Sequence, residues 1–253
     1  MYSYNYNMNN NILIPFIISL IAGLSTLIGC IFIYIKPKNT NNFIGICLAF
    51  SATIMISISI LELIPKGFFN LKNIYGDLYA IISLIIMIII GYGINILINK
   101  TISKNKHNES NLYRVGILSM IALMIHNIPE GILTFLTSSV DIKLGVKLSI
   151  AIMMHNIPEG IAIAIPLFYS TKSKIKAIKN TLISGLSEPF GALLAYLFLY
   201  RFMSNTLIGV ILLFVAGIMI SISINDIFEE AKKYSGKNIL LGIFLGIILI
   251  LLI

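Results

Sequence analysis

The feature that most constrains this chain is a series of long apolar segments, each with enough residues to cross a lipid bilayer. A spanning helix needs about 20 apolar residues. Eight segments are close to that length: residues 12–35, 43–64, 78–98, 113–137, 145–169, 178–200, 206–226 and 238–253. They are apolar on every face and show no period of two, which favours helices over barrel strands. The sequence therefore predicts an all-α integral membrane protein with eight transmembrane helices.

The composition indicates one membrane domain. Hydrophobic residues make up 58% of the chain and charged residues only 11%. No segment between the apolar runs is long enough to bury a core of its own, so residues 1–253 are interpreted as a single transmembrane domain. The net charge of +8 comes from Lys and Arg in short loops, a pattern that disfavours nucleic acid as a partner.

The distribution of basic residues predicts the orientation of the chain. Of its 18 Lys and Arg residues, 13 fall in one set of alternate loops. The positive-inside rule places that set in the cytoplasm and both termini outside the cell (inner or plasma) membrane.

A faint repeat relates the second and seventh predicted helices. Residues 55–60 read Met-Ile-Ser-Ile-Ser-Ile, and residues 219–224 repeat the same six letters. The two helices must run in opposite directions because they are five spans apart. This arrangement is typical of inverted repeats in secondary transporters, here helices 1–3 and 6–8 around a hairpin of helices 4–5. Coincidence in an Ile- and Ser-rich chain is the alternative interpretation.

A stronger repeat lies in the fourth and fifth predicted helices. Residues 126–131 read His-Asn-Ile-Pro-Glu-Gly, and residues 155–160 read the same. His126 and Glu130 are four residues apart, as are His155 and Glu159, so each pair shares one helix face. Helical rise places both motifs roughly 15 Å from the connection between the helices, so the two half-sites can meet.

The amides of Asn127 and Asn156, three residues before each glutamate, can flank the carboxylates. The sixth predicted helix adds a third mid-span acid, Glu188, again followed by a proline. On insertion scales three such acids cost about 8–10 kcal/mol before pairing, so a bound cation is the natural counter-charge. Imidazole, amide and carboxylate groups without a thiolate suit a first-row divalent metal such as Zn²⁺, Fe²⁺ or Mn²⁺. Shared carboxylates would allow two ions close together.

Other interpretations of these residues stay open at this point. A single histidine or glutamate inside a membrane can also serve helix packing or proton relay. An intramembrane metalloenzyme is another alternative, although zinc proteases of that kind carry His-Glu-x-x-His rather than His-x-x-x-Glu with a proline between. A membrane scaffold that binds metal and moves nothing would also use this chemistry.

These motifs resemble those of the ZIP family of metal transporters, in particular bacterial zinc-uptake permeases of broad specificity. The resemblance covers nearly the whole chain. It rests on the doubled His-Asn-x-Pro-Glu-Gly motif and on Ser-Gly-x-x-Glu-Pro at residues 184–189. It implies a 3+2+3 arrangement and a binuclear mid-membrane site formed by His126, Asn127, Glu130, His155, Asn156, Glu159 and Glu188. Glu130 and Glu159 would be the bridging ligands.

The resemblance also implies a function: a secondary transporter, not an enzyme, that imports divalent cations by alternating access. Zn²⁺ is the first candidate, followed by Fe²⁺, Mn²⁺, Co²⁺ and Cd²⁺. These ions would be substrates, up to two per site, and no cofactor is expected. An exporter is the alternative. The expected partners are metal ions and the lipid bilayer, with a homodimer as an open alternative.

The chain departs from the family pattern on the cytoplasmic side. Many members carry a His-Glu pair near the end of helix 7, where this chain has Asn225 and Asp226. An exit route would then rest on Asp226 and Glu229. The loop before helix 4, often rich in histidine, holds only His107, and at the opposite mouth Glu62 could attract incoming cations.

Overall fold

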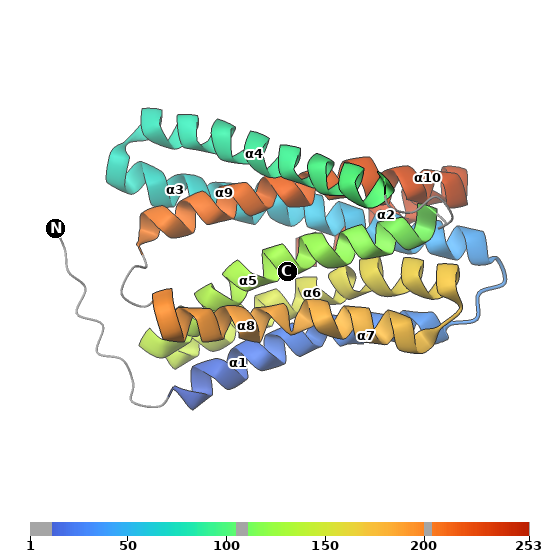
Figure 1. Ribbon diagram of the computed structural model, residues 1–253, viewed down its shortest axis with the longest axis horizontal. Coiled ribbons are helices and arrows are strands. Elements are labelled where there is room, and N and C mark those ends of the chain that lie inside the picture. The colour runs from blue at the N-terminus through green and yellow to red at the C-terminus, as the bar shows by residue number, and fades with distance from the viewer. Residues whose placement is uncertain (1–11, 105–110, 200–203, 253) are drawn as a thin grey trace.

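The computed structural model describes residues 12–104, 111–199 and 204–252, and these ranges contain helices and no strand (Figure 1). Within them, seven helical segments are long and apolar enough to cross a membrane: Leu13–Tyr34, Thr40–Tyr75, Asp77–Thr101, Asn111–Val140, Ile142–Thr171, Lys174–Phe198 and Thr206–Leu252. The predicted class, an all-α multi-pass membrane protein, is thereby confirmed.

The first two spans are each built from more than one kind of helix. Helix α1 (Leu13–Leu24) continues as a 3₁₀ segment, Ser25–Tyr34. Helix α2 (Thr40–Ile58) passes through a π-helical turn, Ser59–Leu63, into α3 (Ile64–Tyr75). This second span runs beyond the predicted end at residue 64, because Pro65 lies in the first turn of α3, where proline is tolerated.

The centre of the chain forms a tight helical hairpin. After α4 (Asp77–Lys104), helices α5 (Asn111–Val140) and α6 (Ile142–Thr171) are joined by a single non-helical residue, Asp141. Its carboxylate accepts hydrogen bonds from the backbone N–H groups of Lys143 and Leu144, which caps α6. The predicted hairpin of residues 113–137 and 145–169 is therefore present, with a shorter turn than its boundaries implied.

The sixth span also changes its helix type along its length. It consists of α7 (Lys174–Gly185), α8 (Ser187–Leu194) and a π-helical turn, Ala195–Leu199. Helix α8 packs against α5, and α1 packs against both hairpin helices. The hairpin is therefore flanked by the first and sixth spans.

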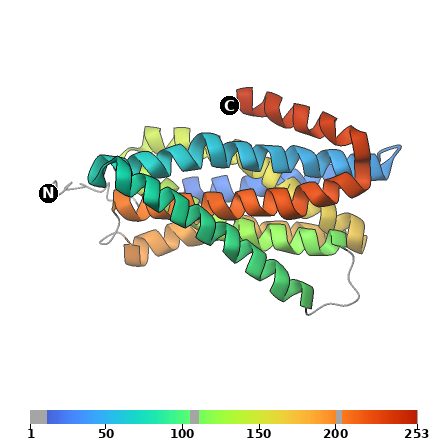
Figure 2. The same ribbon diagram turned by 90° about the horizontal axis from the view of Figure 1, so that it is seen from above.

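The last helical segment, Thr206–Leu252, reverses its direction along its length. Helix α9 (Asn205–Ile222) leads through a π-helical turn, Ser223–Phe228, into α10 (Glu229–Ser235), and a short 3₁₀ turn precedes α11 (Ile239–Leu252). Gly236, with φ of 50°, lies where α10 ends, and α11 doubles back from there (Figure 2). The predicted segments 206–226 and 238–253 therefore belong to one continuous helical stretch that folds back on itself.

Two further contacts show how the outer spans pack on each other. Gly45 of α2 lies against Ser235 of α10, and Gly67 of α3 lies against Gly209 of α9. The α2–α3 and α9–α10 spans therefore run antiparallel. Together with α5 and α6 they enclose the main hydrophobic core.

Candidate metal centre

The doubled motif lies within the two hairpin helices. Both helices run on through their motif prolines, Pro129 in α5 and Pro158 in α6. All seven side chains predicted to form the site are buried: His126, Asn127, Glu130, His155, Asn156, Glu159 and Glu188. Buried polar groups of this kind need partners, because an unsatisfied charge in an apolar interior is costly.

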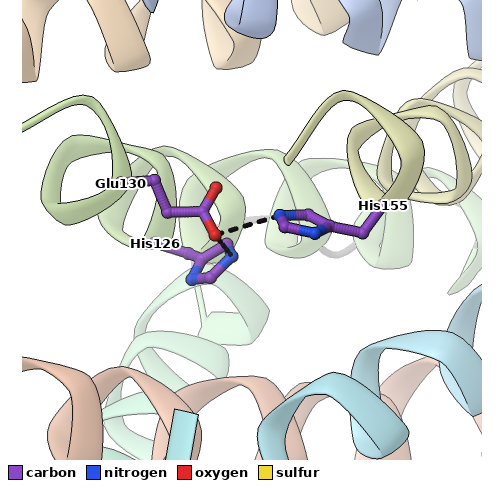
Figure 3. Close-up of side chains that lie close together, drawn as sticks. All are labelled: His126, Glu130 and His155. Carbon is purple, nitrogen blue, oxygen red and sulfur yellow. Dashed lines mark hydrogen bonds and ion pairs between the residues drawn. The ribbon is translucent and has the colours of Figure 1, made fainter. Parts of the chain in front are cut away.

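Glu130 is the central acid of the site. Its Oε1 atom lies 3.1 Å from His126 Nε2 and 3.0 Å from His155 Nε2. Figure 3 shows this carboxylate between the two imidazoles, which come from different helices. The ligand atoms of the three residues all lie within 4.8 Å of one another. That spacing is compatible with a single metal ion bound by all three.

Glu159 also lies close to His126. Its Oε1 atom is 3.4 Å from His126 Nε2, and its side chain is 1% exposed. Within the described part of the chain, neither of its carboxylate oxygens has a hydrogen-bond partner. Glu159 therefore offers two buried acceptor atoms beside the Glu130 cluster.

The third acid, Glu188, reaches the hairpin through Asn156. The amide nitrogen of Asn156 donates to Glu188 Oε2 at 3.0 Å and to the carbonyl oxygen of Ala22 at 2.9 Å. The matching amide nitrogen of Asn127 donates to the carbonyl oxygen of Ser184 at 3.2 Å. Both amide oxygens have no hydrogen-bond partner among the described residues, so both are available as ligands.

Backbone packing explains why each motif ends in glycine. Gly131 lies against the backbone of Glu188 in α8, and Gly160 lies against the backbone of Thr26 in the first span. A Cβ atom at either position would overlap a carbonyl oxygen. These glycines therefore let the flanking spans approach the hairpin closely enough to bring Glu188 to Asn156.

The donor atoms define what the cluster can bind. Glu130, Glu159 and Glu188 together leave four buried carboxylate oxygens without a hydrogen bond from described residues. Imidazole nitrogens, amide oxygens and carboxylates are the donors that first-row divalent metals accept. A divalent cation would satisfy the unpaired oxygens and offset the buried negative charge.

The predicted pathway residues lie in different surroundings. Glu62 is half-buried and forms an ion pair with exposed Lys66, and exposed Glu229 pairs with Lys232 at 2.7 Å. Asp226 is buried and accepts hydrogen bonds from Asn95, at 3.3 Å, and from Asn99. His107 lies outside the described residues. Glu62 and Glu229 therefore have the ordinary environment of solvated acids, whereas Asp226 does not.

Some polar contacts were not predicted from the sequence. Asn95 and Asn99 come from α4, and they meet Asp226 only through the packing of α4 on the seventh span. Ser51 of α2 donates to the carbonyl oxygen of Pro158 at 2.7 Å. The sequence feature that could have predicted these contacts is the presence of amides and a hydroxyl inside otherwise apolar helices.

The fold and the site together define a multi-pass membrane protein with a buried cluster of imidazoles and carboxylates. A family model described as "ZIP Zinc transporter" matches residues 99–253. The chain belongs to the ZIP zinc transporter family. Members of this family are transporters rather than enzymes, and zinc is their substrate rather than a cofactor.

Zinc transporters of several bacteria match this chain over nearly its full length. The zinc transporter ZupT of Lysinibacillus sphaericus is 37% identical over 249 residues, covering 92% of this chain and 93% of its own. The zinc transporter ZupT of Chlorobium chlorochromatii is 36% identical over 251 residues, covering 93% and 94%. That of Clostridium perfringens is 32% identical over 268 residues, covering 94% of each.

Proposed function

We propose that this protein imports divalent metal cations into the cytoplasm, with Zn²⁺ as the main substrate and Fe²⁺, Mn²⁺, Co²⁺ and Cd²⁺ as further ones. The observation that carries the proposal is the buried cluster in which Glu130 bridges His126 and His155. Family membership and the naming of the relatives as zinc transporters support zinc.

The proposed binding site comprises the seven buried residues of α5, α6 and α8. Glu130 and Glu159 would bridge two ions, because each has an oxygen near His126 and each keeps at least one unpaired oxygen. The free amide oxygens of Asn127 and Asn156 and the free Oε1 of Glu188 would complete the ligand set. Residues with mixed N and O donors bind several first-row metals, which supports a broad substrate range.

Alternating access through this site would use a 3+2+3 topology of eight spans with inverted repeats. Paired contacts support the repeats. Asn127 donates to the Ser184 carbonyl of the sixth span, and Asn156 donates to the Ala22 carbonyl of the first span. Gly131 lies against Glu188 as Gly160 lies against Thr26. These two contacts of the first span are thus each matched by one from the sixth.

The repeat of residues 55–60 and 219–224 also has a structural counterpart. Both segments end in a π-helical turn, and the two turns begin at the same position of the repeat, Ser59 and Ser223. Such turns are frequent at functional sites. We infer that they act as matching flexible points in the second and seventh spans, which face opposite ways.

The proposed location is the plasma membrane, with the lysine-rich loops in the cytoplasm and both termini outside. The excess of Lys and Arg in alternate loops supports this orientation. A homodimer remains a prediction that cross-linking of the protein in native membranes would test.

Uptake measurements on the purified protein in liposomes test the proposal. Labelled Zn²⁺ is added outside, with Fe²⁺, Mn²⁺, Co²⁺, Ni²⁺ and Cd²⁺ as competitors. We expect accumulation above that of empty liposomes and competition by several of these ions. Binding without accumulation would indicate a non-transporting scaffold. In vesicles of known protein orientation, flux only from the cytoplasmic side would indicate export.

A further inference from the structure

One corner of the molecule carries an unusual concentration of positive charge. Six exposed lysines lie just after the first span, between α6 and α7, and in the first turns of α7: Lys36, Lys38, Lys172, Lys174, Lys176 and Lys179. We call this set the basic corner. It is separate from the candidate metal centre, whose buried residues lie within α5, α6 and α8.

Two aromatic contacts tie the lysines of this corner to different spans. The ammonium group of Lys174, at the start of α7, lies 4.2 Å from the centre of the Tyr34 ring at the end of the first span. The ammonium group of Lys172 lies 5.3 Å from the centre of the Tyr169 ring in α6. The end of the first span, the end of α6 and the start of α7 therefore lie together at this corner (Figure 1).

The sequence around the basic corner contains no acid. Residues 12–61 and 160–187, which contain all six lysines, include no Asp or Glu. In the described part of the chain, none of the six pairs with a carboxylate, whereas Lys66, Lys72, Lys232 and Lys233 each do. An uncompensated group of this size favours an anionic partner.

Exposed apolar side chains stand among these lysines. Ile175, between Lys174 and Lys176, is 79% exposed, and Tyr34 is 55% exposed. A soluble anion such as phosphate would satisfy the charge but would leave these side chains in water. A phospholipid satisfies both, because its phosphate lies at the headgroup level and its acyl chains lie directly below.

We propose that the basic corner binds the headgroup of an anionic phospholipid, with Ile175 and Tyr34 entering the boundary between headgroups and acyl chains. Clusters of four to eight Lys and Arg beside a transmembrane helix are typical of such binding. The bound lipid bridges the ends of the spans whose middle portions carry His155 and Glu188. The proposal does not depend on which metal the protein carries.

Native mass spectrometry of the full chain in detergent tests the proposal. The protein is titrated with phosphatidylglycerol and, separately, with phosphatidylcholine of the same acyl chains, and the retained lipids are counted. The test variant is Lys174→Gln with Lys176→Gln. The matched control is Lys143→Gln with Lys147→Gln, which removes two exposed lysines from the start of α6.

We expect the unmodified protein to retain phosphatidylglycerol in preference to phosphatidylcholine. The variant of the basic corner should lose about tenfold of that preference, while the control keeps it. Glycerol phosphate added in excess should not displace the lipid, since it lacks acyl chains. Equal retention of the two lipids, an equal loss in the control variant, or displacement by glycerol phosphate would each overturn the proposal.

Discussion

Asn156 of α6 donates a hydrogen bond to Glu188 of α8 at 3.0 Å and thereby joins the central hairpin to the sixth span. The same amide nitrogen donates to the Ala22 carbonyl at 2.9 Å, so one side chain links its own span to two others. Among the described residues, the side chain of its counterpart Asn127 makes only the bond to the Ser184 carbonyl. The two asparagines of the repeated motif therefore differ in how much packing depends on them.

Replacement of these asparagines should reveal that difference. Asn156→Ala removes two hydrogen bonds, one of them to a buried carboxylate, and should lower the free energy of unfolding by about 2–3 kcal/mol. Asn127→Ala removes one bond to a neutral carbonyl and should cost about 1 kcal/mol. Thermal unfolding in detergent measures both variants, and equal losses or the reverse order would contradict the assignment.

The close contact at Gly131 predicts opposite effects of two glycine substitutions. A Cβ at Gly131 overlaps the backbone of Glu188, whereas nothing lies within 4 Å of a Cβ at Gly93 in α4. Gly131→Ala should destabilise the protein by about 1–3 kcal/mol or more through overpacking. Gly93→Ala should stabilise it by about 0.5–1 kcal/mol through helix propensity. Melting temperatures that move in the same direction would argue against this packing.

Asp226 provides a third test, because it is buried and receives hydrogen bonds from two asparagines of α4. Asp226→Ala removes two hydrogen bonds to a buried carboxylate and should cost about 2–3 kcal/mol. The control is Glu229→Ala, in which an exposed pair with Lys232 is lost and no measurable change is expected. Comparable destabilisation by the two substitutions would be inconsistent with the structure.

The hydrogen bond from Ser51 to the Pro158 carbonyl links α2 to the hairpin beside the second motif. Ser51→Ala should lower the free energy of unfolding by about 1 kcal/mol. Thr101→Ala is the control, because that exposed hydroxyl donates to the Leu97 carbonyl of its own helix and so links no second helix through this bond. Chemical denaturation in mixed micelles compares them, and an unchanged Ser51 variant would exclude a stabilising role for this bond.

Much of the site was predictable because its signals are local in sequence. The spacing of His126 and Glu130 places both on one helix face, and the repeat at residues 155–160 supplies the second half. In the structure, Glu130 lies beside both histidines, and Glu188 accepts a hydrogen bond from Asn156. These buried acids therefore have the polar partners that an apolar environment makes necessary. The metal-ligand roles of these residues remain predictions.

Other features depend on packing between distant segments. The contacts of Asp226 with Asn95 and Asn99 arise only when α4 packs on the seventh span. The extension of the second span to Tyr75 depends on how Pro65 fits into a first helical turn, which apolar length alone does not indicate. The fold-back of α11 likewise depends on the backbone conformation of Gly236.

We propose that the buried acids of the hairpin bind the metal during its passage through the membrane. Zn²⁺ or Cd²⁺ uptake into liposomes by the variant Glu130→Ala with Glu159→Ala tests this directly, beside Asp77→Ala as control, which removes only an exposed acid paired with Lys72. We expect the double variant to insert and fold but to show no uptake above empty liposomes, whereas the control transports normally. Undiminished uptake by the folded double variant would contradict the proposed site.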